Sequence, residues 1–208
     1  MNRHFAALGC LCGLATIANA DIVNLAVYEN SDNADVSGLN LFVEVTDGGS
    51  YIEFAFGNSS SISAVVTAVY VEDADAIDGW LLNGHISAES TGVNFSDGAT
   101  PPNPAQIGDA FGGSWAGNLY AADADSPGPT NGINETGNES LTLRFDYGGG
   151  ATFADVLAAL TADDPGFRFA QHVQGLPGGY SVWTTTVPAP GSVTAVALAG
   201  LLAARRRR

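Results

Sequence analysis

Hydrophobic and polar residues alternate with a period of two along most of the chain from Asp21 onward. Successive side chains of a β-strand point to opposite faces, so this period is typical of strands with one buried face. Glycine, asparagine, aspartate and serine separate the alternating segments, as they do in turns. The pattern predicts eight strands, at residues 22–28, 39–46, 51–56, 63–71, 80–86, 140–147, 167–173 and 180–186.

A helical pattern interrupts the strands after residue 151. Thr152 and Asp155 have the spacing of a capping box, in which two side chains satisfy the first free N–H groups of a helix. The apolar residues that follow form one stripe, made of Phe153, Val156, Leu157 and Leu160. We therefore expect one short helix here, closing an end or edge of the sheets.

Eight short strands and one helix predict a mainly β domain over residues 21–186. The expected architecture is an antiparallel two-sheet sandwich of jelly-roll or immunoglobulin-like kind. The stretch 97–138 is rich in proline, glycine, asparagine and aspartate, so we expect long surface loops there.

Residues 1–20 have the features of a signal peptide. Arg3 supplies the positive start, an apolar stretch covers residues 5–17, and Ala18 and Ala20 form a small-x-small cleavage box before Asp21. We expect cleavage after Ala20 by signal peptidase. A lipoprotein leader, cut before Cys10, is the alternative, but the three residues before Cys10 match the usual motif only in part.

The last 22 residues, 187–208, fall into three parts. A rigid break comes first, formed by Val187, Pro188, Ala189, Pro190 and Gly191. An apolar run at 193–204 follows, and at about 1.5 Å per residue its helix would span roughly 18 Å, short of the roughly 30 Å hydrocarbon core of a membrane. Four arginines end the chain: Arg205, Arg206, Arg207 and Arg208. The alternative is a buried C-terminal helix of the domain.

This order of break, apolar run and arginines resembles the PEP-CTERM sorting signal, with Pro188-Ala189-Pro190 where that family has Pro-Glu-Pro. The resemblance implies a bacterial cell-surface or secreted protein whose C-terminal helix holds it transiently in the membrane. An exosortase-type transpeptidase would then process the tail. The segments 131–147, 152–160 and 172–179 also look similar to ectodomains that often precede this tail.

The charge is divided between the ends and the middle of the chain. All 22 acidic residues lie between Asp21 and Asp164, and there is no lysine. Arg144 and Arg168 are the only basic residues of 21–186 other than histidine. A strongly acidic surface repels phosphate, so we expect neither nucleic acid nor an anionic lipid surface as a partner of the domain. Solubility outside the cell is the simplest role of this charge.

Catalytic motifs are absent from the sequence, which has no Gly-x-Ser-x-Gly elbow, phosphate loop or zinc spacing. Both cysteines, Cys10 and Cys12, lie in the expected leader, which excludes a disulfide or thiolate site in 21–186. His172 falls on a predicted strand, where a structural histidine is the expected role. We therefore expect a domain that is not an enzyme, and a glycoside hydrolase using two carboxylates is the least favoured alternative.

Two ligand sites have weaker support. The acidic turn 72–79 offers Asp73, Asp75 and Asp78 as calcium ligands, although its spacing does not match an EF-hand and a solvated acidic loop is the alternative. The loop of Asp123 and Asp125, with Asn131 and Asn134, is similar. No other cofactor is expected.

Trp115 lies in a glycine-rich loop and is the candidate contact for extracellular polysaccharide, or else a plug over the end of the sandwich.

For the function of the whole domain, the first expectation is a structural or adhesive role at the cell surface. A carbohydrate-binding module that uses calcium is the alternative.

Overall fold

The computed structural model describes residues 20–104, 114–162 and 167–186. The expected leader up to residue 19, including Ala18, lies outside these ranges, and so does the expected tail from Val187 to Arg208. The termini of the described fold are the first residue of one strand, Ala20, and the last residue of another, Thr186.

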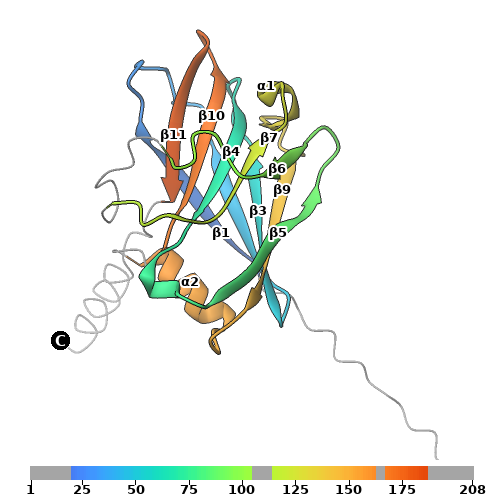
Figure 1. The fold of residues 1–208 in the computed structure, drawn as a ribbon. Helices are drawn as coiled ribbons and strands as arrows, with labels where there is room; N and C mark the ends of the chain where they lie inside the picture. Colours follow the sequence, from blue (N-terminus) through green and yellow to red (C-terminus); the bar gives the residue numbers. More distant parts are fainter. Residues whose placement is uncertain (1–19, 105–113, 163–166, 187–208) are drawn as a thin grey trace, which may run out of the picture.

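Eleven strands of the described chain form one sheet that is nearly closed into a barrel (Figure 1). They are β1 (Ala20–Glu29), β2 (Leu41–Asp47), β3 (Tyr51–Asn58), β4 (Val65–Glu72), β5 (Leu81–Glu89), β6 (Phe95–Asp97), β7 (Asn118–Ala124), β8 (Ile133–Asn134), β9 (Ser140–Tyr147), β10 (Phe169–Leu176) and β11 (Tyr180–Thr186). Their order is β5-β9-β3-β2-β1-β11-β10-β4-β7-β6, and β8 pairs with β4. Each pairing of these named strands is antiparallel.

Strand β1 joins the two halves of the sheet. Residues Ala20 to Asn24 pair with β2, whereas Leu25 to Glu29 pair with β11. The mainly β, antiparallel prediction is therefore confirmed. Two separate sheets of jelly-roll or immunoglobulin-like kind are not confirmed, because the paired strands are all connected into one sheet.

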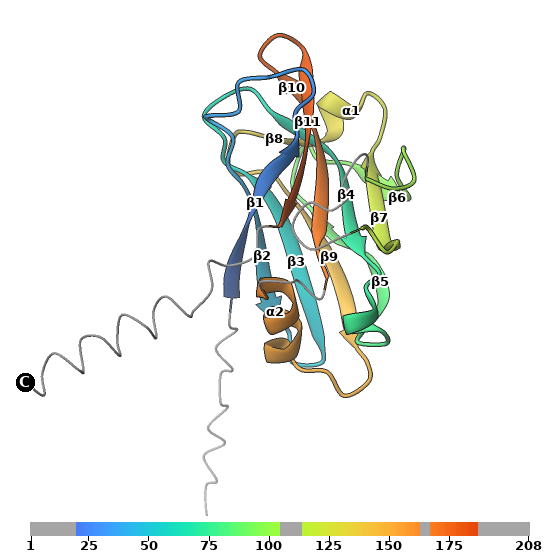
Figure 2. The ribbon, with the colours of Figure 1, turned by 90° about the vertical axis from the view of Figure 1, so that its left-hand side faces the viewer.

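Helix α2 (Phe153–Thr161) is the predicted helix, and its capping box is formed. The Asp155 N–H donates to the Thr152 hydroxyl oxygen at 3.3 Å, and the Thr152 N–H donates to the Asp155 carboxylate at 2.9 Å. The helix lies at the end of the fold where β1 begins (Figure 2). Val156 and Leu160 of its stripe are buried.

Two further short helical segments were not predicted, α1 (Gly128–Asn131) and the 3-10 turn η1 (Asp75–Ile77). The expectation of loops alone over 97–138 is wrong, because β7, β8 and α1 fall in this stretch. Six of the seven residues of β7 are half-buried and three are alanines, so its sequence lacks a clear alternation of buried and exposed positions.

Apolar side chains fill the space enclosed by the sheet. The Phe169 ring packs edge-on against Phe54 at 4.8 Å and against Phe56 at 5.4 Å between ring centroids. A second, smaller cluster lies on the outer face of the β11–β10–β4 part, around Tyr70 and Trp183. Both faces of this part of the sheet are therefore covered.

Candidate functional site

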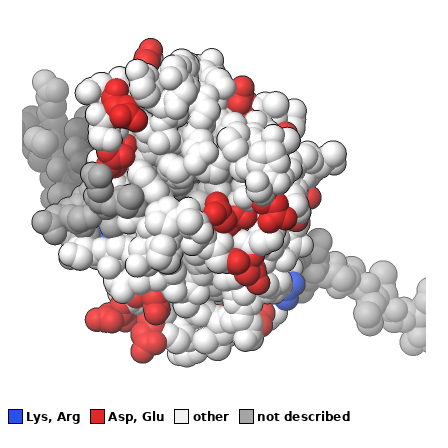
Figure 3. Space-filling view, turned by 45° about the horizontal axis from the view of Figure 1, so that its top comes forward, with Lys and Arg blue, Asp and Glu red and all other residues white. Residues whose placement is uncertain are grey.

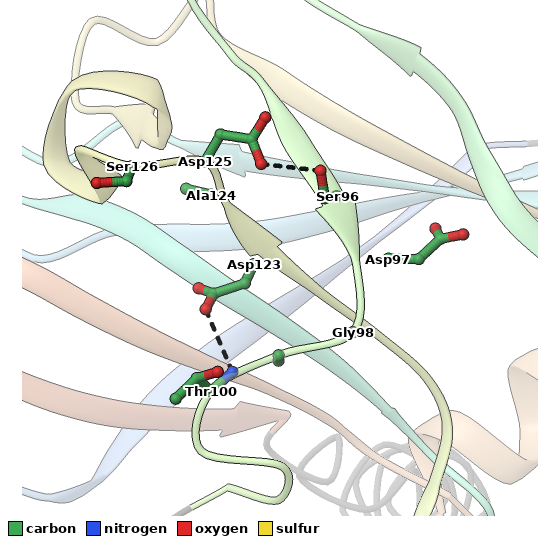
Figure 4. A pocket seen from close by; sticks show the side chains of 9 residues that line it. Ser96, Asp97, Gly98, Thr100, Asp123, Ala124, Asp125 and Ser126 are labelled. Carbon is green, nitrogen blue, oxygen red and sulfur yellow. Dashed lines mark hydrogen bonds between the residues drawn. The ribbon is translucent and has the colours of Figure 1, made fainter.

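An open cleft with a volume of about 540 Å³ lies beside β6 and β7 (Figure 4). It is lined by Ser96, Asp97, Gly98, Ala99, Thr100, Asp123, Ala124, Asp125 and Ser126. Carboxylates and hydroxyls make up most of its polar groups, so the cleft offers many hydrogen-bond acceptors and several donors to a ligand.

Two of the aspartates that line the cleft are Asp123 of β7 and Asp125, which directly follows the last residue of that strand. Asp125 accepts hydrogen bonds from the Ser96 hydroxyl at 2.8 Å and from the Asn94 amide at 2.6 Å. Asp123 accepts one from the Thr100 N–H at 3.2 Å. These bonds fix the two carboxylates to the neighbouring strand and loop (Figure 4).

Burial raises the pKa of the Asp123 carboxyl above its ordinary value, and backbone N–H donors, including that of Thr100, act in the opposite direction. Nearby, the Tyr120 hydroxyl donates to the Asp97 carboxylate. Burial, followed by this bond to Asp97, raises the pKa of Tyr120 well above its ordinary value. The cleft is thus acidic and suited to neutral ligands with hydroxyl groups, whereas it disfavours anions.

The three aspartates predicted to bind calcium lie around η1. The Asp73 N–H donates to the Gly117 carbonyl at 2.9 Å, Asp75 begins η1, and Asp78 follows its last residue. Within residues 20–104, 114–162 and 167–186, no group of three or more His, Cys, Asp or Glu is placed to hold a metal ion. The calcium site remains a prediction without structural support.

In the second acidic loop, the asparagines contact their own neighbourhood. The Asn131 amide donates to the backbone carbonyl of Asp125 at 2.8 Å, and the Asn134 amide donates to Glu139 at 2.8 Å. These side chains stabilise the loop around α1.

Trp115 is half-buried against the outer face of the sheet. Its indole N–H donates to Asn118 at 2.9 Å, and the guanidinium of Arg168 lies 5.6 Å from its ring centroid. On one side of Trp115, the Ser114 carbonyl accepts a hydrogen bond from Arg168. On the other side, the Ala116 N–H donates one to Glu72. These contacts are those of an anchored side chain, and Trp115 does not line the cleft.

Glu72 and Arg168 were not singled out from the sequence as a pair. Arg168 is one of two arginines in 21–186 and falls at the start of an alternating segment, where a charged residue needs a partner. That position was the available signal, but it did not identify Glu72.

His172 lies on the outer face of β10, with its ring stacked on Trp183 at 4.5 Å. Its Nδ1 lies 3.3 Å from the Gln174 amide and 3.5 Å from the Thr67 hydroxyl. Burial lowers the pKa of His172, and the nearby charge of Glu29 acts in the opposite direction. These packed contacts agree with the expected structural role.

The expected signal-peptidase site falls at the edge of the fold. Ala20 pairs with Thr46 and Asp21 pairs with Val45, so the predicted cleavage bond lies between the first two described residues of β1. Ala20 and Asp21 are both exposed. In the part of the chain that the structure describes, no helix has the length and apolar character needed to cross a membrane.

Acidic side chains are scattered over the face shown in Figure 3, with very little basic surface among them. Of the two arginines in the described chain, Arg168 is buried. The Arg144 guanidinium lies 3.5 Å from the Tyr51 ring centroid and 3.9 Å from Asp146. The charged side chains on this face are therefore almost all acidic (Figure 3).

Comparison with known proteins adds no assignment to this geometry. No protein-family model matches the chain, and the searches of curated proteins and of solved structures give no match. Function must therefore be argued from the residues of this chain.

Proposed function

We propose that this chain is an exported, C-terminally sorted protein of the cell surface or extracellular matrix, with a structural or adhesive domain that is not an enzyme. Signal peptidase removes residues 1–20. An exosortase-type enzyme recognises Val187–Gly191, while the helix at 193–204 and the four terminal arginines retain the chain in the membrane.

One observation carries the proposal: the described strands fill the segment between the two signals. β1 begins at Ala20 and β11 ends at Thr186. Cleavage after Ala20 and within the tail would therefore remove only the exposed first residue of β1 from the described strands and leave the core intact. The acidic surface is consistent with a soluble product that does not bind nucleic acid. The two facing halves of the sheet support a sandwich-like architecture of jelly-roll or immunoglobulin-like kind.

The mass of the delivered protein tests this proposal. The chain is produced in a bacterium that has an exosortase-type enzyme, and the released protein is measured by intact mass spectrometry. We expect a product that starts at Asp21 and lacks 193–208. A control with Pro188→Ala and Pro190→Ala should accumulate unprocessed in the membrane. Released protein with its full tail would contradict the proposal.

A carbohydrate-binding role is the second candidate, and the cleft favours it. Carboxylates and hydroxyls of β6, β7 and the adjoining loops face one open cavity, an arrangement suited to the hydroxyl groups of a neutral polysaccharide. Asp123 and Ser126 both line this cavity.

A glycan array followed by titration calorimetry tests the second role. We expect hits among neutral glycans and weakening by about tenfold or more in Asp123→Asn, since one good hydrogen bond to a charged group has that order of effect. Trp115→Ala tests the other predicted contact. An array without hits would contradict carbohydrate binding while leaving the sorting proposal unaffected.

A further inference from the structure

Two polar side chains lie on the inner face of the sheet, on the neighbouring strands β10 and β11. Gln171 and Thr184 are directly opposite each other in the register, and each is 0% exposed. Phe169 and Val173, two residues to either side of Gln171, belong to the apolar core, and Val182 does so beside Thr184. By the alternation of a strand, Gln171 and Thr184 face the same interior.

These side chains have no hydrogen-bond partner in the described part of the protein. This is true of both amide atoms of Gln171 and of the Thr184 hydroxyl. Native proteins rarely leave buried amides unpaired, because losing water without a replacement partner is unfavourable. Asn58, a fully buried amide of the same core, follows that rule and donates to the carbonyls of Ala64 and Ile133.

We infer that Gln171 and Thr184 together bind one internal water molecule. Opposite residues on one face of an antiparallel pair have Cβ atoms about 4.5–5.5 Å apart, and a water reaches about 2.8 Å to each side. Side chains that start this close together can both reach one water molecule, and in this proposal a single molecule lies between them. The described structure has no direct hydrogen bond between the two side chains, because none of their three polar atoms has a partner in it.

The water site also favours one register of β10 and β11. A slip by one residue would turn His172 towards the core and take Gln171 out of it, because every side chain would change face. The two polar groups share a water only in the observed register. The register of β11 in turn affects the whole sheet, because β11 lies between β10 and β1, the strand that joins the two halves.

The sign of a stability change tests the inference. Thr184→Val keeps the side-chain shape and removes the hydroxyl. In the full chain we expect its melting temperature to fall by about 2–6 °C, because Gln171 and the water lose a partner. A rise in melting temperature would show that the hydroxyl had no partner, and would overturn the inference. Thr185→Val is the matched control, since the Thr185 hydroxyl donates to the Phe169 carbonyl at 2.8 Å and its loss should destabilise in either case.

A direct measurement separates a bound water from a direct bond between the two residues. The chain contains three glutamines, Gln106, Gln171 and Gln174, so ¹⁵N-glutamine labelling gives a simple NMR spectrum, and Gln171→Met identifies the Gln171 amide signal. We expect a cross-peak between this amide and a long-lived water. Its absence from the wild-type spectrum would overturn the inference whatever the melting temperatures. If Thr184→Val does not fold, the wild-type spectrum alone decides.

Discussion

Arg168 and Glu72 form a two-pronged ion pair in the interior of the protein. Arg168 Nε lies 2.7 Å from Glu72 Oε2, and Nη2 lies 2.6 Å from Oε1. The two residues are 2% and 3% exposed. The pair also holds the segment around Trp115, because Glu72 accepts from the Ala116 N–H at 3.0 Å and Arg168 donates to the Ser114 carbonyl at 3.1 Å.

Removing one partner of this ion pair should strongly lower the free energy of unfolding. In Arg168→Met the Glu72 carboxylate keeps its burial and loses its cation, so we expect a loss of about 3–5 kcal/mol in the free energy of unfolding. In Arg168→Met with Glu72→Met, no buried charge remains, and the loss should be smaller than in the single variant. Urea unfolding, followed by tryptophan fluorescence, measures the stability of the double variant and of the single variants Arg168→Met and Glu72→Met. A double variant as unstable as the sum of the two single variants would contradict this account.

His172 should make stability depend on pH. Its pKa is lowered in the folded protein, mainly by burial, so the unfolded chain binds the proton more readily. Stability is therefore lost as the pH falls below about 6.5, the ordinary pKa of histidine. His172→Phe keeps a ring against Trp183 and cannot take up a proton.

Chemical denaturation at pH 8 and pH 5 checks this expectation. The free energy of unfolding of His172→Phe, taken relative to that of wild type at the same pH, should be higher at pH 5 than at pH 8. Because Asp123 titrates in both proteins, its contribution cancels from the difference. An equal difference in stability at the two pH values would show that the proton on His172 has no effect on folding.

Local patterns in this sequence predicted local structure well. Each of the eight predicted strands is found close to its predicted place, and the Thr152–Asp155 capping box starts α2 as expected. Alternation and capping depend on residues a few positions apart, so they are readable from sequence. β7 was missed because its mostly half-buried residues show no clear alternation and its place in the sheet comes from pairing with β4.

Long-range relationships were not readable in this way. β1 exchanges one partner strand for another between Asn24 and Leu25, and nothing in its own pattern marks the change. Glu72 adjoins the acidic turn that suggested calcium, yet it is buried and paired with a residue 96 positions away. The cleft likewise joins residues 96–100 to 123–126, which only the folding of β6 onto β7 brings together.

A calcium titration tests the site predicted from the sequence at Asp73, Asp75 and Asp78. If these aspartates bind calcium, the melting temperature in millimolar calcium should exceed that in sodium chloride of matched ionic strength by more than about 2 °C, roughly 1 kcal/mol for a chain of this size, and chelator should remove the rise. The salt control is needed because any cation screens repulsion between the acidic groups. A melting temperature that is indifferent to calcium and to chelator would contradict the calcium site.

A side chain added at Gly84 should destabilise the protein, because the ring of Phe145 covers this position. It lies in β5 where the register with β9 shifts between Leu82 and His85. A Cβ added at this position would overlap the Phe145 ring, which is buried in the core and cannot move without disturbing it. Overpacking of this kind costs about 1–3 kcal/mol, and we expect that loss for Gly84→Ala.

Gly128→Ala is the matched control for this prediction. Its added Cβ would lie 3.7 Å from Thr67 Cγ2, an ordinary van der Waals contact, and would be restricted only by the ring of Pro129, so we expect a smaller loss than for Gly84→Ala. Urea unfolding of both variants measures the contrast. Equal effects would mean that the bulge in β5 relaxes away from Phe145, and that this edge of the sheet is less firmly packed than the position of the ring indicates.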